Sequence, residues 1–183
     1  MLNFDQKKFI NFVVDISPRS VEELRPDYHP RWLGEGAFRE AFDVRIGRKS
    51  LGLVIKFPLF EGGSNLESIE HARDEISAID CIRADSHLLA LRRYMPDVLY
   101  FDQNNGVTVM PKYLPVYGTK KHVSIRVIAE FDGFVDAFDA MLNDLIPGMR
   151  YEFDSSVENF GVTKKREYIL LDAGLLGALK AKR

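Results

Sequence analysis

Apolar and polar residues alternate in ways that predict a helix followed by three strands in the first third of the chain. Residues 4–14 carry apolar positions at helical intervals and predict a short amphipathic helix. Three runs of strand type follow, and the glycine-containing turns between them predict antiparallel pairing. These runs are residues 31–33, 41–46 and 51–57.

A helix and a hairpin are predicted next. Ser64 or Asn65 can cap a helix that runs to about Arg83. Residues 98–101 and 107–110 then have strand character on either side of Asn104-Asn105-Gly106, which is a strong hairpin signal.

The longest helical pattern covers residues 124–145, and Pro147-Gly148 ends it. After a loop from Arg150, short strands are expected near 160–163 and 167–171, with a small helix at the end of the chain. The apolar positions of the long helix are Ile125, Ile128, Phe131, Val135, Phe138 and Leu142. The expected fold class is α+β, in two lobes with a five-stranded antiparallel sheet in the first. The expected division is residues 1–30, 31–113 and 114–183.

Composition and charge exclude several classes of function. The net charge of −2 gives no reason to expect nucleic acid or an anionic membrane as a partner. A single cysteine allows no internal disulfide, and four scattered histidines lack metal-ligand spacing. The N-terminus does not look like a secretory signal, and no apolar run suits a membrane span. A cytoplasmic location is expected, in the host cytoplasm if the protein comes from a phage or is an effector.

Two glycines, a lysine and a glutamate in the first lobe are candidates for chemistry. Gly34 and Gly36 lie between two predicted strands, where glycine lets the backbone approach a phosphate, although glycines there usually only make a turn. Lys56 lies in an apolar strand, on the same face as Val54, and either reaches to water or has a partner. Glu75 falls on the apolar arc of the following helix, so it is the predicted partner.

These residues resemble the small lobe of protein kinases, in which a glycine loop, a strand lysine and a helix glutamate occur in this order. Lys56 follows Gly34 by 22 residues and Glu75 follows Lys56 by 19, as in that family. Met110 and the segment after it resemble the hinge that binds adenine. The resemblance therefore implies nucleotide binding by Gly34, Gly36, Val54, Lys56, Met110 and Lys112.

Two further motifs resemble the large lobe of the same family. Asp154 precedes Asn159 by five residues, as in the catalytic loop, and Asp172-Ala-Gly174 resembles the metal-binding Asp-Phe-Gly. The resemblance implies that Asp154 positions the acceptor hydroxyl, while Asn159 and Asp172 hold Mg²⁺ across the phosphates of ATP. It implies an ATP- and Mg²⁺-dependent phosphotransferase that acts on a protein hydroxyl or on itself, with a protein as substrate or activating partner.

The sequence also departs from the kinase pattern. Arg39 replaces the third glycine of the loop, where it either contacts phosphate or holds the loop away from it. Glu152-Phe153 replaces the usual His-Arg, and Ala173 replaces the Phe of the metal motif. Only nine residues follow Gly174, so the usual substrate-binding segment is missing from this sequence.

These departures leave rival functions open. One is a pseudokinase that binds nucleotide and regulates or inhibits a partner protein. Another is an interaction domain that binds no nucleotide. Phosphorylation of a small molecule is a weaker alternative, because the acceptor pocket of such enzymes needs helices that this sequence lacks.

Overall fold

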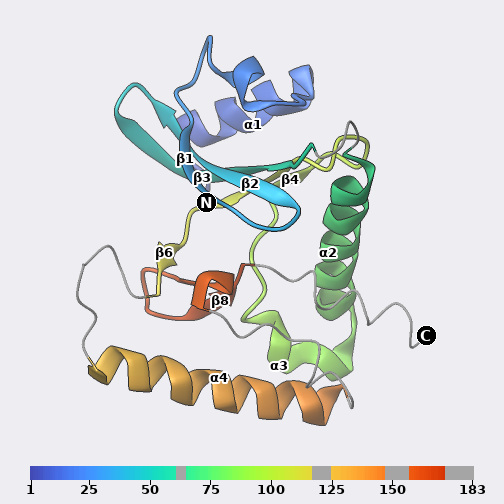
Figure 1. The fold of residues 1–183 in the computed structure, drawn as a ribbon, viewed down its shortest axis with the longest axis vertical. Coiled ribbons are helices and arrows are strands. Elements are labelled where there is room, and N and C mark those ends of the chain that lie inside the picture. The colour runs from blue at the N-terminus through green and yellow to red at the C-terminus, as the bar shows by residue number, and fades with distance from the viewer. Residues whose placement is uncertain (61–64, 117–124, 147–156, 172–183) are drawn as a thin grey trace. The chain divides into compact units, whose positions relative to one another are not determined.

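The structure is a computed structural model, and its ribbon is shown in Figure 1. It describes residues 1–60, 65–116, 125–146 and 157–171. In these residues the fold is α+β, with a five-stranded antiparallel sheet and four α-helices. The chain divides into two compact units, which are residues 1–76 with 97–112 and residues 77–96 with 113–183.

The first unit is built on the five-stranded sheet, and the predicted antiparallel pairing is confirmed. In spatial order the strands are β1 (Arg31–Glu35), β2 (Arg39–Ile46), β3 (Lys49–Pro58), β5 (Thr108–Pro111) and β4 (Tyr100–Phe101). The last of these is shorter than the strand predicted at 98–101. The amide of Leu99 still donates to the carbonyl of Val109 at 2.9 Å, so the hydrogen bonding with β5 begins at Leu99, one residue before β4.

One face of this sheet packs against α1 (Phe4–Ile16) and the 3₁₀ helix η1 (Val21–Leu24). Strand alternation sends Leu53, Ile55 and Phe57 into this core, where all three are almost fully buried. Val54 and Lys56 therefore lie on the opposite face, as the sequence predicted. The sheet thus has one apolar face, which holds the unit together, and a second face that carries polar groups.

A buried carboxylate ties the end of α1 to the turn between β4 and β5. The Ser17 hydroxyl donates to Asp102, whose other oxygen accepts from the amides of Asn104 and Asn105 at 2.8 and 3.2 Å. Burial alone raises the pKa of Asp102, but these hydrogen bonds stabilise the charged form and bring its pKa below the ordinary 3.8. Gly106 completes the turn with φ of +69°, which confirms the predicted Asn-Asn-Gly hairpin.

The helix α2 (Leu66–Ala84) starts directly after Asn65, one of the two predicted caps, and ends one residue after the predicted end at Arg83. The carbonyl of Asn65 accepts from the amide of Ile69 at 2.9 Å, so it begins the hydrogen-bond ladder of the helix. Residues up to Ile76 belong to the first unit and those from Ser77 onward to the second.

The second unit has a small three-stranded sheet and an aromatic core. Its elements are η2 (Ser86–Leu88), α3 (Leu89–Arg92), β6 (Leu114–Pro115), α4 (Ile125–Leu145), η4 (Val157–Asn159), β7 (Phe160–Val162) and β8 (Tyr168–Leu170). The two predicted strands are confirmed as β7 and β8, whereas β6, which pairs with β7, was not predicted. The loop expected from Arg150 and the last helix lie outside the described residues.

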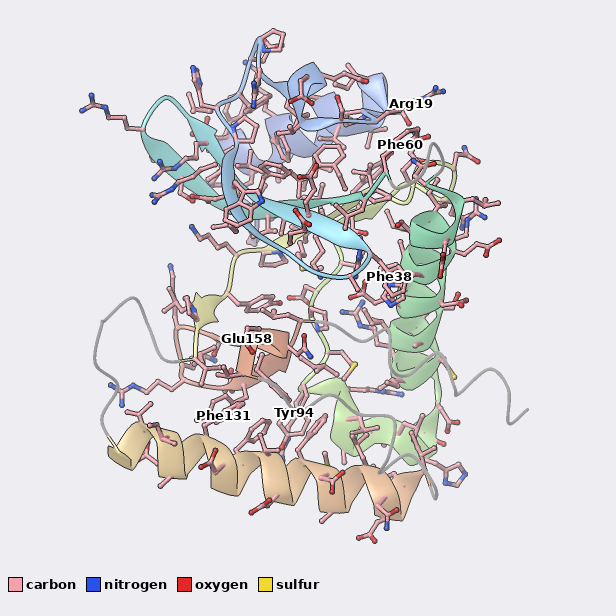
Figure 2. All side chains as sticks on the ribbon, viewed as in Figure 1. Arg19, Phe38, Phe60, Tyr94, Phe131 and Glu158 are labelled. Atoms are coloured by element: carbon pink, nitrogen blue, oxygen red, sulfur yellow. The ribbon has the colours of Figure 1, made fainter. Side chains whose placement is uncertain are left out.

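The long helix α4 confirms the predicted helix, with a small correction to its buried face. Phe131, Phe138 and Leu142 are buried, but Ile128 is 38% exposed. The half-buried Phe134 joins the packed face instead, and its ring stacks on Tyr168 with centroids 4.2 Å apart. Tyr94 and Phe131, both labelled in Figure 2, belong to the same aromatic cluster. None of the helices formed by the described residues is both long and apolar enough to cross a membrane.

Candidate functional site

Glu75 is the centre of a buried ionic cluster on the polar face of the sheet. Its side chain has no solvent exposure, and one carboxylate oxygen lies 3.7 Å from the ammonium nitrogen of Lys56. The apolar arc of α2 turns Glu75 inward, and the alternation of β3 turns Lys56 toward it. The predicted contact between these two residues is therefore confirmed, while the roles implied by the kinase resemblance stay predictions.

Arg39, at the start of β2, is a second cation on the same carboxylate. Its Nη2 forms a short ion pair with the other oxygen of Glu75, and its side chain is only 6% exposed. The sequence left the role of Arg39 open, and its pairing with Glu75 was not foreseen. Its Nη1 is also buried and has no hydrogen-bond partner among the described residues.

The pairing of the strands explains why these cations converge. Ala41 lies opposite Lys56, so Arg39, two residues earlier on β2, is a diagonal neighbour of Lys56 on the same face. On the far side of Lys56, Thr108 of β5 is its direct partner and is fully buried. The hydroxyl of Thr108 likewise has no hydrogen-bond partner in the part of the chain that the structure describes.

The two predicted phosphate-loop glycines lie in the hairpin between β1 and β2. Gly34 pairs with Ala41, and the amide of Gly36 donates to the carbonyl of Arg39 at 2.8 Å. Neither glycine has a positive φ. A Cβ built on Gly34 would meet nothing within 4 Å, and one on Gly36 would meet only the Arg39 carbonyl at 3.9 Å. The turn itself therefore does not require glycine at either position.

The hairpin is fastened to α2 by its aromatic residue. The ring of Phe38 stacks on His71 with centroids 4.2 Å apart and an interplanar angle of 19°, and Figure 2 labels Phe38 beside α2. The carbonyl of Phe38 accepts from the amide of Leu59 at 2.8 Å, just beyond β3. Residues 35–37, directly before Phe38 in the hairpin, are exposed.

The hinge-like residues lie at the other end of the same face. Val54 of β3 is paired with Met110 of β5, and both are buried. The amide of Lys112 donates to the carbonyl of Gly52 at 2.9 Å. Lys112 can therefore offer that amide to another acceptor only if this hydrogen bond breaks.

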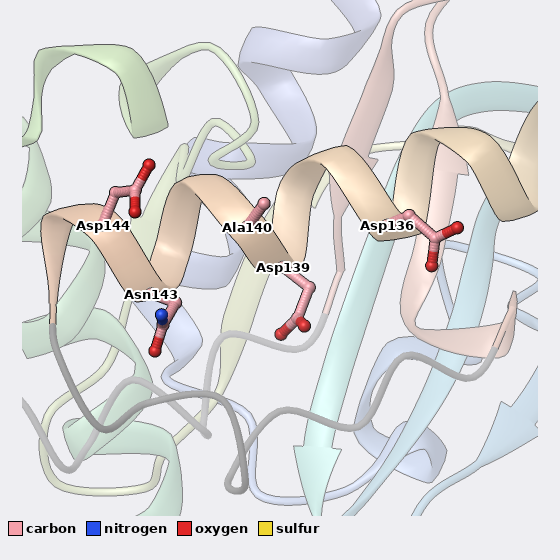
Figure 3. Close-up of a pocket in the computed structure, with 5 residues that line it drawn as sticks. All are labelled: Asp136, Asp139, Ala140, Asn143 and Asp144. Carbon is pink, nitrogen blue, oxygen red and sulfur yellow. The ribbon is translucent and has the colours of Figure 1, made fainter.

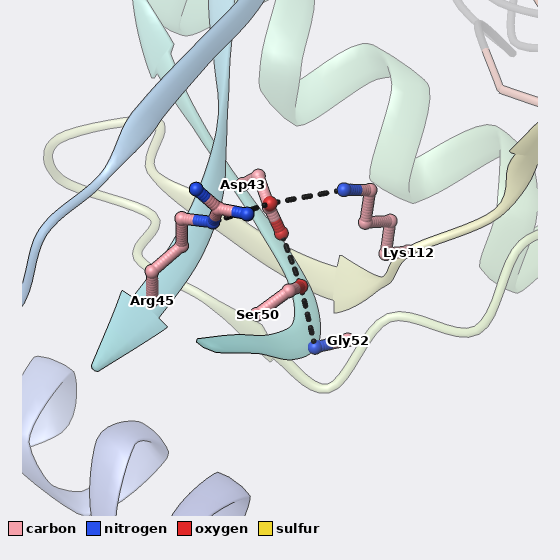
Figure 4. A network of polar contacts seen from close by, with 5 residues as sticks. All are labelled: Asp43, Arg45, Ser50, Gly52 and Lys112. Atoms are coloured by element: carbon pink, nitrogen blue, oxygen red, sulfur yellow. Dashed lines mark hydrogen bonds and ion pairs between the residues drawn. The ribbon is translucent and has the colours of Figure 1, made fainter. Parts of the chain in front are cut away.

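Asp43 forms a second ionic cluster on this face, which Figure 4 shows. Its side chain is 2% exposed and lies 3.2 Å from Nε of Arg45 and 3.0 Å from Nζ of Lys112. The Ser50 hydroxyl also donates to Asp43 and accepts from the amide of Gly52. This carboxylate was not predicted, although an aspartate that alternates with the apolar Phe42 and Val44 is the signal that could have identified it.

The predicted large-lobe residues are only partly described. Asn159 ends η4 directly before β7, and its backbone carbonyl accepts from the amide of Leu171 at 2.7 Å. This bond extends the pairing of β7 with β8 and brings Asn159 beside the residue that precedes Asp172. Asp154 and Asp172 themselves lie outside the described residues.

The described part of α4 also carries an acidic pocket, shown in Figure 3, with a volume of about 390 Å³. The described residues that line it come from one side of the helix: Asp136, Asp139, Ala140, Asn143 and Asp144. No group of three or more His, Cys, Asp or Glu side chains suited to a metal ion occurs among the described residues. The described part of the lining is therefore acidic but forms no metal-binding group.

The described geometry defines an α+β protein with a buried cluster of two cations and one carboxylate on its main sheet. The sequence matches no protein-family model and has no significant similarity to a curated protein.

Proposed function

We propose that the protein binds ATP with Mg²⁺ and is a minimal phosphotransferase of protein-kinase type, with a two-lobed fold, acting on a protein hydroxyl or on itself. The observation that carries this proposal is the buried contact of Lys56 with Glu75, at 3.7 Å, on the face of the sheet opposite the apolar core. A buried lysine held by a carboxylate on a neighbouring helix is the arrangement that protein kinases use to hold the α and β phosphates.

Each proposed residue has a distinct role. Lys56 holds the phosphates and Glu75 orients Lys56, while Val54 and Met110 supply buried apolar surface for the adenine. Asn159 and Asp172 would hold Mg²⁺, which neutralises charge on the phosphates when bound, and Asp154 would position the acceptor hydroxyl.

Two features of the first unit fit a nucleotide better than a purely structural sheet. Gly34 and Gly36 have room for a Cβ and ordinary backbone angles, so a ligand backing onto the hairpin gives a reason for glycine there. Nη1 of Arg39 and the hydroxyl of Thr108 are buried polar atoms without a hydrogen-bond partner in the described ranges, and a bound ligand can satisfy them.

Binding is tested by the thermal unfolding of the purified chain with and without Mg-ATP. A ligand at 100 times its dissociation constant stabilises by about 2.7 kcal/mol, or roughly 5–10 °C in a chain of this size. Lys56→Met is expected to abolish the shift. Lys49→Met, at the exposed start of the same strand, is the matched control and keeps it. No shift for the unaltered protein at millimolar Mg-ATP would refute nucleotide binding and favour an interaction domain.

A pseudokinase that binds nucleotide without transferring phosphate is the second candidate. Glu75 is shared, because Arg39 forms the shorter contact and Lys56 lies at 3.7 Å, beyond hydrogen-bond range. Transfer of labelled γ-phosphate separates the two functions. Incorporation that Asp154→Ala and Asp172→Ala both abolish supports the phosphotransferase. Nucleotide binding with no incorporation, alone or with candidate partner proteins, supports the pseudokinase.

A further inference from the structure

We infer that Arg39 is a phosphate-binding residue, whose guanidinium stays on Glu75 through one arm and binds a phosphate oxygen through the other. The inference rests on the proposed nucleotide site and adds to it a residue that the kinase resemblance does not supply, since glycine is usual at this position of the loop.

The guanidinium of Arg39 has unused donors in a place where unused donors are unfavourable. Its side chain is 6% exposed, Nη2 is paired with Glu75, and the buried Nη1 has no partner among the described residues. A guanidinium is planar and presents its donors as a fork, which matches the oxygens of a carboxylate or a phosphate. Because one side of the fork already faces a carboxylate, the free side suits a second anion.

The surroundings of Arg39 favour a polyphosphate as that anion. Arg39 and Lys56 contact the two oxygens of the same Glu75 carboxylate, so their positive charges lie close together. Gly34, on the neighbouring strand β1, leaves open space where a side chain would stand. Two adjacent cations beside open backbone fit a chain of phosphate groups better than a single carboxylate.

The acidic residues of the hairpin do not oppose this binding. Glu35 and Glu40 are directly paired, so their side chains lie on one face of the sheet, and alternation along β2 puts that face opposite Arg39. Burial raises the pKa of Glu40, with smaller contributions from Glu22 and Glu35. Glu40 faces the side of the sheet that η1 covers, because it pairs with Phe57, which lies in the core there.

Nη1 of Arg39 is closed off from solvent, so a phosphate can reach it only if the residues that cover it shift. Residues 35–37, which precede Phe38 in the chain, are exposed. Phe38, next to Arg39, stacks on His71 of α2. Arg39 therefore lies at the junction between the exposed tip of the hairpin and the buried cluster.

The test compares three ligands by isothermal titration: Mg-ATP, Mg-tripolyphosphate and adenosine. Arg39→Gln is expected to weaken ATP and tripolyphosphate about 10- to 100-fold, as the loss of a charge-assisted hydrogen bond predicts, and to leave adenosine unchanged. Arg45→Gln is the matched control, because Arg45 lies on the same strand and also pairs with a buried carboxylate. It should leave all three affinities unchanged.

The outcomes separate this inference from the proposed function. If the protein binds ATP and Arg39→Gln binds it equally well, the inference is wrong and the nucleotide site stands. If the protein binds tripolyphosphate through Arg39 but not ATP, the anion site stands and the proposed function is wrong. Binding of neither ligand overturns both.

A folding defect in Arg39→Gln does not leave the question open. Arg39→Lys keeps a cation for Glu75 but replaces the fork with a single ammonium, so it is expected to fold and still to bind ATP less tightly. Arg39→Lys with an unchanged melting temperature and unchanged ATP affinity would also overturn the inference.

Discussion

Replacing Gly34 by alanine should raise the stability of the protein while weakening its binding of ATP. The added methyl group meets no atom within 4 Å, and the backbone at Gly34 needs no left-handed conformation. Alanine then restricts only the unfolded chain, which stabilises by about 0.4–1 kcal/mol. For 183 residues this corresponds to a rise in melting temperature of roughly 1–4 °C.

The same methyl group occupies the space through which phosphate is proposed to approach the hairpin. An added methyl in a filled site costs about 1–3 kcal/mol, which is roughly a 5- to 150-fold loss of affinity. Stability is measured by thermal unfolding without ligand, and affinity by titration with Mg-ATP. The two measurements should therefore change in opposite directions.

Gly106→Ala is the matched control, because Gly106 is a glycine that the fold does require. Its φ is +69°, and a Cβ there would lie 2.8 Å from Pro58 Cγ and 3.1 Å from Ile69 Cα. Left-handed strain and overpacking together should destabilise it by about 2–5 kcal/mol. If Gly34→Ala also destabilises, the hairpin needs its glycine for folding. If Gly34→Ala binds ATP as tightly as the unaltered protein, Gly34 does not face a ligand.

Three further predictions concern stability. The pKa of Asp102 is lower in the folded protein than in the unfolded chain, so ionised Asp102 stabilises the fold above about pH 4, and this stabilisation is lost as the pH falls through the folded pKa. In urea unfolding, the difference in stability between the unaltered protein and Asp102→Asn should therefore be constant from about pH 5 to 8 and shrink below about pH 4. Asp43→Asn should lower the free energy of unfolding by about 2–3 kcal/mol in the same assay. This is less than for a fully buried ion pair, because Arg45 and Lys112, the cationic partners of Asp43, are partly exposed. A loss below about 0.5 kcal/mol would refute this prediction. Phe138→Ala should lower the free energy of unfolding by about 3–5 kcal/mol, because Phe138 is 1% exposed. Phe60→Ala is the control and should change it by less than about 0.5 kcal/mol, because Phe60 is 70% exposed. Equal effects of the two variants would contradict the buried position of Phe138.

Local pattern was sufficient for most of the first unit. The strands and the inward side of α2 follow from periods of two and 3.6 residues, because these periods fix which side chains share a face. The tight turns between the strands predicted their antiparallel pairing. The same reasoning placed Lys56 and Glu75 in contact. It predicted that contact because Lys56 is a charged residue in an otherwise apolar strand and Glu75 lies on the apolar arc of its helix.

What the sequence did not predict depends on partners that are distant in the chain. The strand β6 has two residues, one of them Pro115, and exists only because β7 pairs with it. Two residues are too few to show a period. Ile128 has the spacing of the buried side of α4 but is 38% exposed. A helical period shows which residues share one side of a helix, but it does not show how far along that side the packing partners extend.

Arg39 shows the same limit at the candidate site. Its contact with Glu75 depends on the register of β2 against β3, in which Ala41 lies opposite Lys56. A shift of one residue would turn Arg39 to the other face of the sheet. The sequence could show that Arg39 stands where the kinase glycine loop has glycine, but it could not show that Glu75 is the carboxylate that pairs with Arg39.

Arg39 and Lys56 both contact Glu75, and this shared contact suggests what arginine provides at a position where the kinase pattern has glycine. A glycine at position 39 would remove one of the two cations that contact Glu75 among the described residues, and under the proposed function the backbone amides would then have to hold the phosphates. With Arg39 present, one buried carboxylate contacts two cations at once, so under the proposed function less side-chain ordering would accompany the binding of a phosphate. The amide of Gly36 is already committed to the Arg39 carbonyl. Under the proposed function, the guanidinium of Arg39 would replace a backbone donor that the hairpin uses for its own hydrogen bond.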